Sequence, residues 1–260
     1  MSARHPRQQH GFTLIETLVA LVSGIVVIGA AFAILEISLH QSVRIADRVE
    51  ADQIGRTAMT KIIDELQSAC LAREVTPVQP GSKATEMSFQ TAYSEKSLIG
   101  GSEAYEHRIE WTGTPGPAPK AKSGRLIDYT YKSNGGTWPK FTFEKPATPA
   151  KTVIAENIYE TEAESGGKTT VVPLFQYDKY NTKANSGSEA ALGTLTSLVP
   201  PEAGFGAEEA KTVAAVLVSF TTAPTSKDIR VGRPVALSNQ VTFAFSTPAS
   251  EATIVDGPCQ

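Results

Sequence analysis

The residues with the clearest chemical role lie near the amino terminus, where one acidic side chain stands at the start of a long apolar run. Glu16 is followed by residues 17–35, none of which is charged. As a helix rising about 1.5 Å per residue, this run would measure roughly 28 Å, close to the hydrocarbon thickness of a bilayer. An ionised carboxylate in lipid costs several kcal/mol unless a cation pairs with it, so the sequence predicts a partner for Glu16.

The helix itself offers no such cation, but a cut in the chain would create one. The next basic side chain downstream is Arg44, and those upstream lie within residues 1–10. A new α-amino group on Phe12 would sit at the same depth as Glu16 of a neighbouring copy. Cleavage between Gly11 and Phe12 would therefore make the partner of Glu16 on another molecule.

Residues 11–21, GFTLIETLVAL, behind a short basic leader, closely resemble the class III signal of type IV pilins and type II secretion pseudopilins. The resemblance covers roughly residues 4–70. It implies that a prepilin peptidase cuts after Gly11, that the new Phe12 is N-methylated, and that Glu16 helps to recruit the next subunit. The implied partners are the prepilin peptidase, other pilin or pseudopilin subunits, and an inner-membrane assembly platform.

The leader also predicts orientation. It carries Arg4 and Arg7 and no acid, and a basic segment before an apolar run stays in the cytoplasm. An ordinary secretory signal peptide is disfavoured because the run is too long and begins with an acid. We expect a single-pass protein of the bacterial cytoplasmic membrane with its carboxy-terminal domain outside. The resemblance to pilins implies that the processed protein then becomes part of a cell-surface or periplasmic filament.

The chain is predicted to have four parts: a cleaved leader (residues 1–11), the transmembrane half of a helix (12–35), its amphipathic extramembrane half (36–72), and a globular β-rich domain (73–260). From Ile54 to Cys70 apolar residues recur at three- and four-residue spacing, while Lys61 and Asp64 occupy the other side. One face of the helix is therefore expected to dock on the chain's own sheet.

Beyond Pro77 the apolar period changes to two. Strands are predicted at residues 87–93, 127–131 and 241–245, with weaker candidates at 107–112, 137–143, 152–159 and 171–177. Residues 212–222 are apolar on both faces, which predicts a central strand. Turn-rich stretches at 112–124, 144–151, 181–193 and 200–206 predict surface loops. The expected fold class is α+β and pilin-like, with the long helix packed on a mainly antiparallel sheet.

The carboxy-terminal half carries a second, looser resemblance. Asn157-Ile158, Phe175-Gln176-Tyr177 and the strands predicted at 213–220 and 235–245 follow the order found in larger minor pilins and pseudopilins of the W and J types. Together with the size of the outer domain, this resemblance implies a minor subunit near the tip of a filament.

The two cysteines, Cys70 and Cys259, lie at the expected end of the helix and next to the end of the chain. On the outer side of a membrane such a pair is expected to be oxidised. In the loop-entropy picture, the disulfide would contribute up to about 5 kcal/mol. The alternative is two unrelated thiols.

The sequence shows no recognisable catalytic motif. No Ser-His-Asp grouping, Gly-rich phosphate loop or HExxH motif is evident, so we expect neither an enzyme nor a cofactor. Two distant cysteines make a poor metal site, and the acidic residues Glu160, Glu162 and Glu164 match no defined calcium loop. The sequence predicts no metal.

Charge disfavours nucleic acid as a partner. The formal net charge is −3, and removal of Arg4 and Arg7 would leave 22 basic residues against 27 acidic ones. Nucleic-acid binding calls for a basic face. Two alternatives to a filament subunit stay open: a tip adhesin or DNA-uptake module on the same anchor, and a membrane-tethered ectodomain that does not polymerise.

Overall fold

The computed structural model describes residues 13–69, 75–92, 104–116, 122–137, 140–165, 167–181, 194–225 and 234–243. The chain divides into two compact units, Met1–Ala46 and Asp47–Gln260, and each is described by itself.

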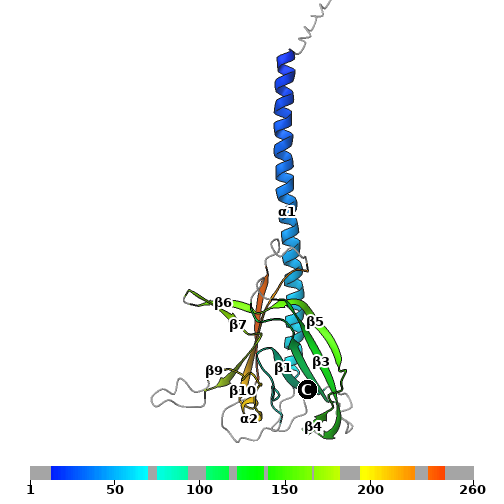
Figure 1. Cartoon of the computed structure of the whole chain (residues 1–260), viewed down its shortest axis with the longest axis vertical. Coiled ribbons are helices and arrows are strands. Elements are labelled where there is room, and N and C mark those ends of the chain that lie inside the picture. The colour runs from blue at the N-terminus through cyan, green and yellow to red at the C-terminus, as the bar shows by residue number, and fades with distance from the viewer. Residues whose placement is uncertain are drawn as a thin grey trace, which may run out of the picture. The chain divides into compact units, whose positions relative to one another are not determined.

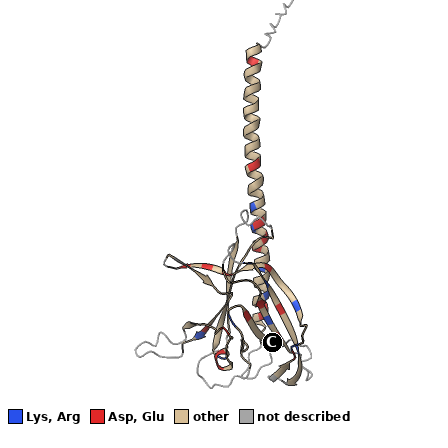
Figure 2. Ribbon diagram, viewed as in Figure 1, with Lys and Arg blue, Asp and Glu red and all other residues tan. Residues whose placement is uncertain are grey.

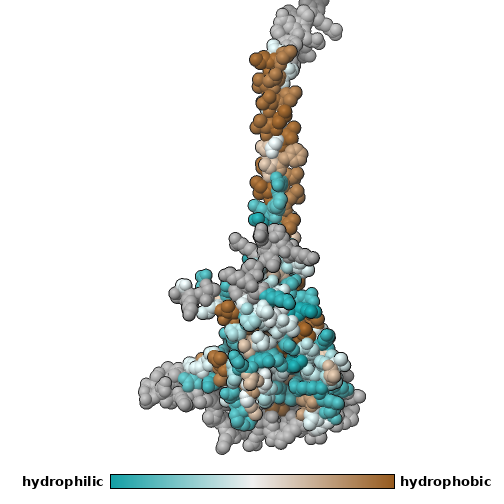
Figure 3. Space-filling model, in the orientation of Figure 1, coloured by the Kyte–Doolittle hydropathy of each residue, from teal (hydrophilic) through white to brown (hydrophobic). Residues whose placement is uncertain are grey.

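A single helix, α1 (Leu14–Gln67), begins in the first unit and ends in the second. No proline occurs within it, and its first half consists mainly of aliphatic residues. In the first unit these side chains are exposed, which Figure 3 shows as a brown surface along the start of α1. Figure 2 shows that charges are sparse there and become frequent further along the helix. The sequence predicted this helix, with an end near Cys70.

The second unit is built on antiparallel strands (Figure 1). Its strands are β1 (Glu86–Ala92), β2 (Ala104–Trp111), β3 (Gly124–Thr137), β4 (Lys140–Phe143), β5 (Ala150–Tyr159), β6 (Thr161–Ser165), β7 (Lys168–Val172), β8 (Phe175–Tyr180), β9 (Leu195–Leu198), β10 (Val213–Thr222) and β11 (Val235–Thr242), with a short helix α2 (Ala207–Ala210) before β10. Nine strands form one sheet along the path β1-β2-β3-β5-β10-β8-β9, to which β4 and β11 add, while β6 and β7 form a separate hairpin.

Strand β10 is the centre of this sheet, as its apolar sequence predicted. It pairs with β11 over residues 215–222. β8 pairs with residues 213–218 of β10, and β5 pairs with residues 221–222 of β10. A strand has two edges, so β8 and β5 share the edge of β10 that β11 does not occupy. Nine of its ten residues are buried. The sheet therefore branches at β10.

Helix α1 packs on the sheet of the second unit through the stripe that the sequence predicted. Its buried residues are Ala51, Gly55, Ala58, Met59, Ile62, Ile63 and Leu66. All of these except Ala51 and Gly55 belong to a core that includes Phe89, Leu126, Phe175, Tyr177 and Phe220. The α+β class, with the long helix on a mainly antiparallel sheet, is confirmed.

Gly55 is the point of closest approach between helix and sheet. A methyl group built on Gly55 would collide with the side chain of Leu237 on β11 and come within 3.0 Å of Thr222 on β10. The Thr222 hydroxyl also donates a hydrogen bond to the carbonyl of Ala51, at 2.8 Å. The absence of a side chain at Gly55 thus lets the helix lie directly against β10 and β11.

Replacing Gly55 by valine should destabilise this unit by about 2 to 3 kcal/mol, because the added carbons overpack a buried contact. Gly24 is the matched control in the same helix, since nothing lies within 4 Å of a methyl group built there. Denaturant unfolding of the full chain in detergent measures both variants. Equal effects of Gly55→Val and Gly24→Val would contradict the close-contact assignment.

Several strands match their predictions and two predictions are wrong. The single strand predicted at 137–143 covers the end of β3 and all of β4, which pair with each other. The strands predicted at 87–93, 107–112, 127–131 and 152–159 correspond to β1, β2, β3 and β5, with shifted ends. The single strand predicted at 171–177 is two strands, β7 and β8, with different partners. Pro173 explains the break, because proline has no backbone N–H to donate to a strand ladder. The strand predicted at 241–245 ends earlier, at Thr242, and begins at Val235.

Candidate functional site: the start of helix α1

The first turn of α1 places Glu16 at the beginning of the apolar run. The carbonyl of Thr13 accepts hydrogen bonds from the amides of Glu16 (3.0 Å) and Thr17 (3.2 Å). The Thr17 hydroxyl donates to the carbonyl of Leu14, at 2.9 Å. A carboxylate in the first turn is favourable because the amino-terminal end of a helix carries partial positive charge.

Glu16 has no cationic partner among the described residues. The ion pairs of the described chain lie in the second unit, from the Asp52–Arg56 pair onward. The neighbours of Glu16 are aliphatic and exposed, with Leu14 at 82% and Ile15 at 72%. A lone carboxylate thus stands among side chains suited to lipid or to another apolar helix.

Helix α1 is long and apolar enough to cross a membrane, and its most apolar window has no residue buried within the protein. Two hydroxyl-bearing residues in this part satisfy their own polar groups. Thr17 and Ser23 each donate to a backbone carbonyl on the same helix, Ser23 to Val19 at 2.7 Å. Their hydroxyls can therefore enter an apolar environment without unpaired donors.

The other predicted site residues are not described. Gly11 and Phe12, the predicted cleavage site, lie outside the described residues, as do Cys70 and Cys259. Cleavage at Gly11-Phe12, the Glu16–Phe12 contact and the disulfide therefore stay predictions.

One buried polar cluster was not foreseen in the sequence. His107 on β2 lies within 3.1 and 3.2 Å of the two carboxylate oxygens of Asp128 on β3, through its Nδ1 atom. Its Nε2 atom faces a carboxylate oxygen of Glu65 on α1, at 3.8 Å, and its ring stacks on Phe89. These contacts tie two strands to the end of the helix, so we assign the cluster a structural role.

The acidic residues considered for calcium do not converge. Glu160 is buried, whereas Glu162 and Glu164 are exposed on β6. Within the described ranges, no group of three or more His, Cys, Asp or Glu side chains is arranged to hold a metal ion.

Glu160 gives the second unit a specific pH response. Burial raises the pKa of Glu160, and a hydrogen bond from the Gly116 amide, at 2.7 Å, partly opposes this shift. A raised folded-state pKa of a carboxyl means that ionisation costs stability, and that this cost disappears as pH falls below the pKa of the unfolded chain.

At pH 7, Glu160→Gln should therefore have a higher free energy of unfolding than wild type, by less than about 1 kcal/mol, as measured by denaturant unfolding. This difference should shrink by pH 4. The exposed neighbour Glu162 provides the control, since Glu162→Gln should change little at either pH. A Glu160→Gln variant that is less stable than wild type at pH 7 would refute the assigned cost.

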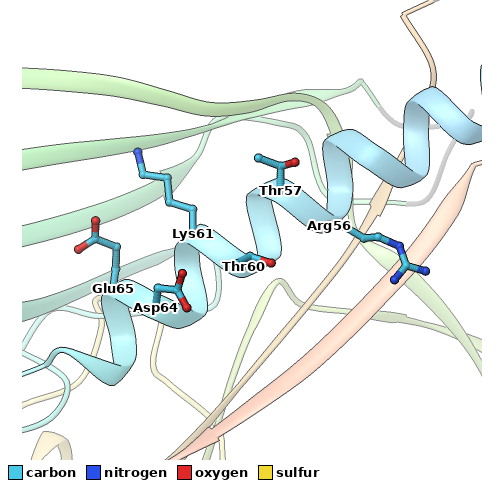
Figure 4. Close-up of a pocket in the computed structure, with 6 residues that line it drawn as sticks. All are labelled: Arg56, Thr57, Thr60, Lys61, Asp64 and Glu65. Carbon is cyan, nitrogen blue, oxygen red and sulfur yellow. The ribbon is translucent and has the colours of Figure 1, made fainter.

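A hollow of about 530 Å³ lies along the polar side of α1 in the second unit (Figure 4). Its described lining comes from that helix alone: Arg56, Thr57, Thr60, Lys61, Asp64 and Glu65. Arg56 is already paired with Asp52, at 2.7 Å. The described lining therefore carries two cations, two hydroxyls and two carboxylates.

Comparison with known protein families identifies a signal motif at the start of the chain. Residues 6–34 match the family described as the prokaryotic N-terminal methylation motif, the signal of type IV pilins. The match includes Gly11, Phe12 and Glu16. No curated protein and no solved structure matches the chain. The motif and the apolar helix together fit a prepilin-peptidase substrate with a single-pass anchor in the inner membrane.

Proposed function

We propose that the protein is a non-catalytic filament subunit, processed between Gly11 and Phe12 and assembled through α1 into a type IV pilus or a type II secretion-like pseudopilus. One observation carries the proposal. The methylation motif over residues 6–34 introduces an apolar helix on which Glu16 has no cation within the described chain.

The mechanism of assembly is physical. Apolar helices packed side by side in the inner membrane supply contact area, and the pairing of Glu16 with the Phe12 amine of a neighbour sets their register. A shifted register would leave both charges unpaired at low dielectric, which is strongly unfavourable. The leader stays in the cytoplasm and the sheet domain lies outside, and the processed subunit then joins a cell-surface or periplasmic filament.

Within such a filament we place the protein among the minor subunits, near the tip or at initiation. The domain outside the helix is large, and the order of its strands supports the W and J resemblance. β5 contains Asn157-Ile158, β8 contains Phe175 and Tyr177, and the apolar β10 and then β11 follow.

Co-expression with the prepilin peptidase and the other subunits of its assembly system tests the proposal. Filaments sheared from the cells should contain the processed chain at a low ratio to the most abundant subunit. A processed chain found only in the membrane fraction, while filaments form normally, would contradict the proposal and favour a tethered ectodomain.

A further inference from the structure

Asn134 lies in the part of strand β3 that pairs with β4 (Figure 1). The register of the two strands shifts between Ser133 and Gly135, so Asn134 is the extra residue of a bulge, with no register partner on β4. Its side chain is exposed. Among the asparagines of the chain, Asn134 alone is followed by glycine.

The residue after Asn134 leaves its own backbone nitrogen accessible. Gly135 has no Cβ, so no side chain shields that nitrogen, and glycine reaches backbone conformations that are closed to other residues. The next residue, Gly136, uses the same freedom, with a φ of 87°. The Gly135 nitrogen can therefore approach Cγ of Asn134, which is the attack that closes a five-membered succinimide ring.

The side chains beside Asn134 favour this attack. The Thr142 hydroxyl donates a hydrogen bond to Oδ1 of Asn134, at 3.0 Å. Attack on Cγ moves negative charge onto that oxygen, and a donor already aimed at it stabilises the charge. The Nδ2 atom of Asn134 donates to the Glu144 carboxylate, at 3.4 Å, on the exposed surface of the hairpin. The site thus joins a nucleophile, a polarised carbonyl and a leaving group with access to water.

We propose that Asn134 is a site of spontaneous deamidation, promoted by the fold of the β3–β4 hairpin. The Gly135 nitrogen gives its proton to solvent and bonds to Cγ of Asn134. The Cγ–Nδ2 bond then breaks as Nδ2 takes a proton and leaves as ammonia. Water opens the ring at either carbonyl, which leaves an aspartate or an isoaspartate at position 134. The net reaction consumes one water and releases one ammonia, without oxidation or reduction.

The reaction changes the charge of the hairpin. A neutral amide that donated to Glu144 becomes a carboxylate beside it, and like charges on adjoining strands destabilise their pairing. Strand β4 has only four residues, and in the described sheet it pairs with β3. Deamidation therefore loosens β4 from β3.

Peptide mapping by mass spectrometry tests the site, on the full chain incubated in detergent at mildly alkaline pH. Asn239 is the internal control, because it is exposed but precedes Gln240. Loss of the amide should be at least about tenfold faster at Asn134 than at Asn239, and Gly135→Ala should slow it at least about tenfold. Loss at Asn134 that is no faster than at Asn239 would overturn the proposal.

Thr142→Val isolates the contribution of the fold, because valine keeps the branched shape and lacks the donor. This variant should lose the Asn134 amide about threefold more slowly than wild type. Thr170→Val is the matched control, since it removes an exposed hydroxyl that bonds to the Ala163 carbonyl on the other hairpin. Equal rates in Thr142→Val and Thr170→Val would refute the promotion of the reaction by the hairpin.

Asn134→Asp measures the consequence of the reaction. The backbone amides of β4 should exchange with deuterium about threefold faster in this variant than in wild type, and Glu144→Gln in the same chain should restore the slower exchange. Unchanged exchange in Asn134→Asp would show that the new charge does not loosen β4.

Discussion

Glu16→Ala should leave cleavage intact and reduce incorporation into filaments about a hundredfold. Without the carboxylate, the amine of a neighbouring Phe12 would be left unpaired in an apolar environment, and removing one partner of a buried pair costs about 3 to 5 kcal/mol. Quantification of the processed chain in sheared filaments and in membranes measures the effect.

Two further variants separate charge from size in this test. Glu16→Gln keeps the shape of the side chain and should fail as Glu16→Ala does, because the interaction requires an ionised group. Glu36→Ala removes an acid beyond the apolar run and should be incorporated nearly normally. Normal incorporation of Glu16→Ala, with partners present, would show that charge pairing does not set the register.

Gly11→Leu should block processing, lowering the cleaved fraction at least about a hundredfold, because a side chain would occupy the position next to the bond that is cut. The uncleaved chain would keep Arg4 and Arg7 and would lack the Phe12 amine, so it should also be absent from filaments. The intact mass of the membrane protein reports the cleaved fraction directly.

Gln9→Ala is the matched control, since it alters the leader without touching the bond. It should be processed like wild type. If Gly11→Leu were cleaved and assembled as efficiently as Gln9→Ala, the cut would not lie after Gly11.

The elements that follow from local sequence were predictable. The long helix follows from its uncharged run, the absence of proline and the stripe from Ile54 to Leu66. Strand β10 follows from being apolar on both faces, which is typical of a strand buried on both sides. These signals arise from neighbouring residues, so no knowledge of distant partners is needed.

Features that depend on distant partners were not predictable. β9 has only four residues, mostly exposed, and exists because it pairs with β8. The role of Gly55 comes from Thr222 and Leu237, which lie far along the chain. The His107–Asp128 pair likewise forms only when β2 and β3 are in register.

At the candidate site, Glu16 was predicted from the sequence, and the structure shows which residues surround it. The carboxylate lies in the first turn of α1, among exposed aliphatic side chains. No described residue supplies its counter-ion, and the proposed partner belongs to a second molecule and forms only on cleavage.

The most direct measurement is the mass of the amino-terminal peptide of the protein isolated from native membranes. The account predicts a chain that begins at Phe12 and carries one methyl group on its α-amine. A chain that begins at Met1, in cells that process other such substrates, would contradict the account, because Glu16 would then have no partner amine on any neighbour.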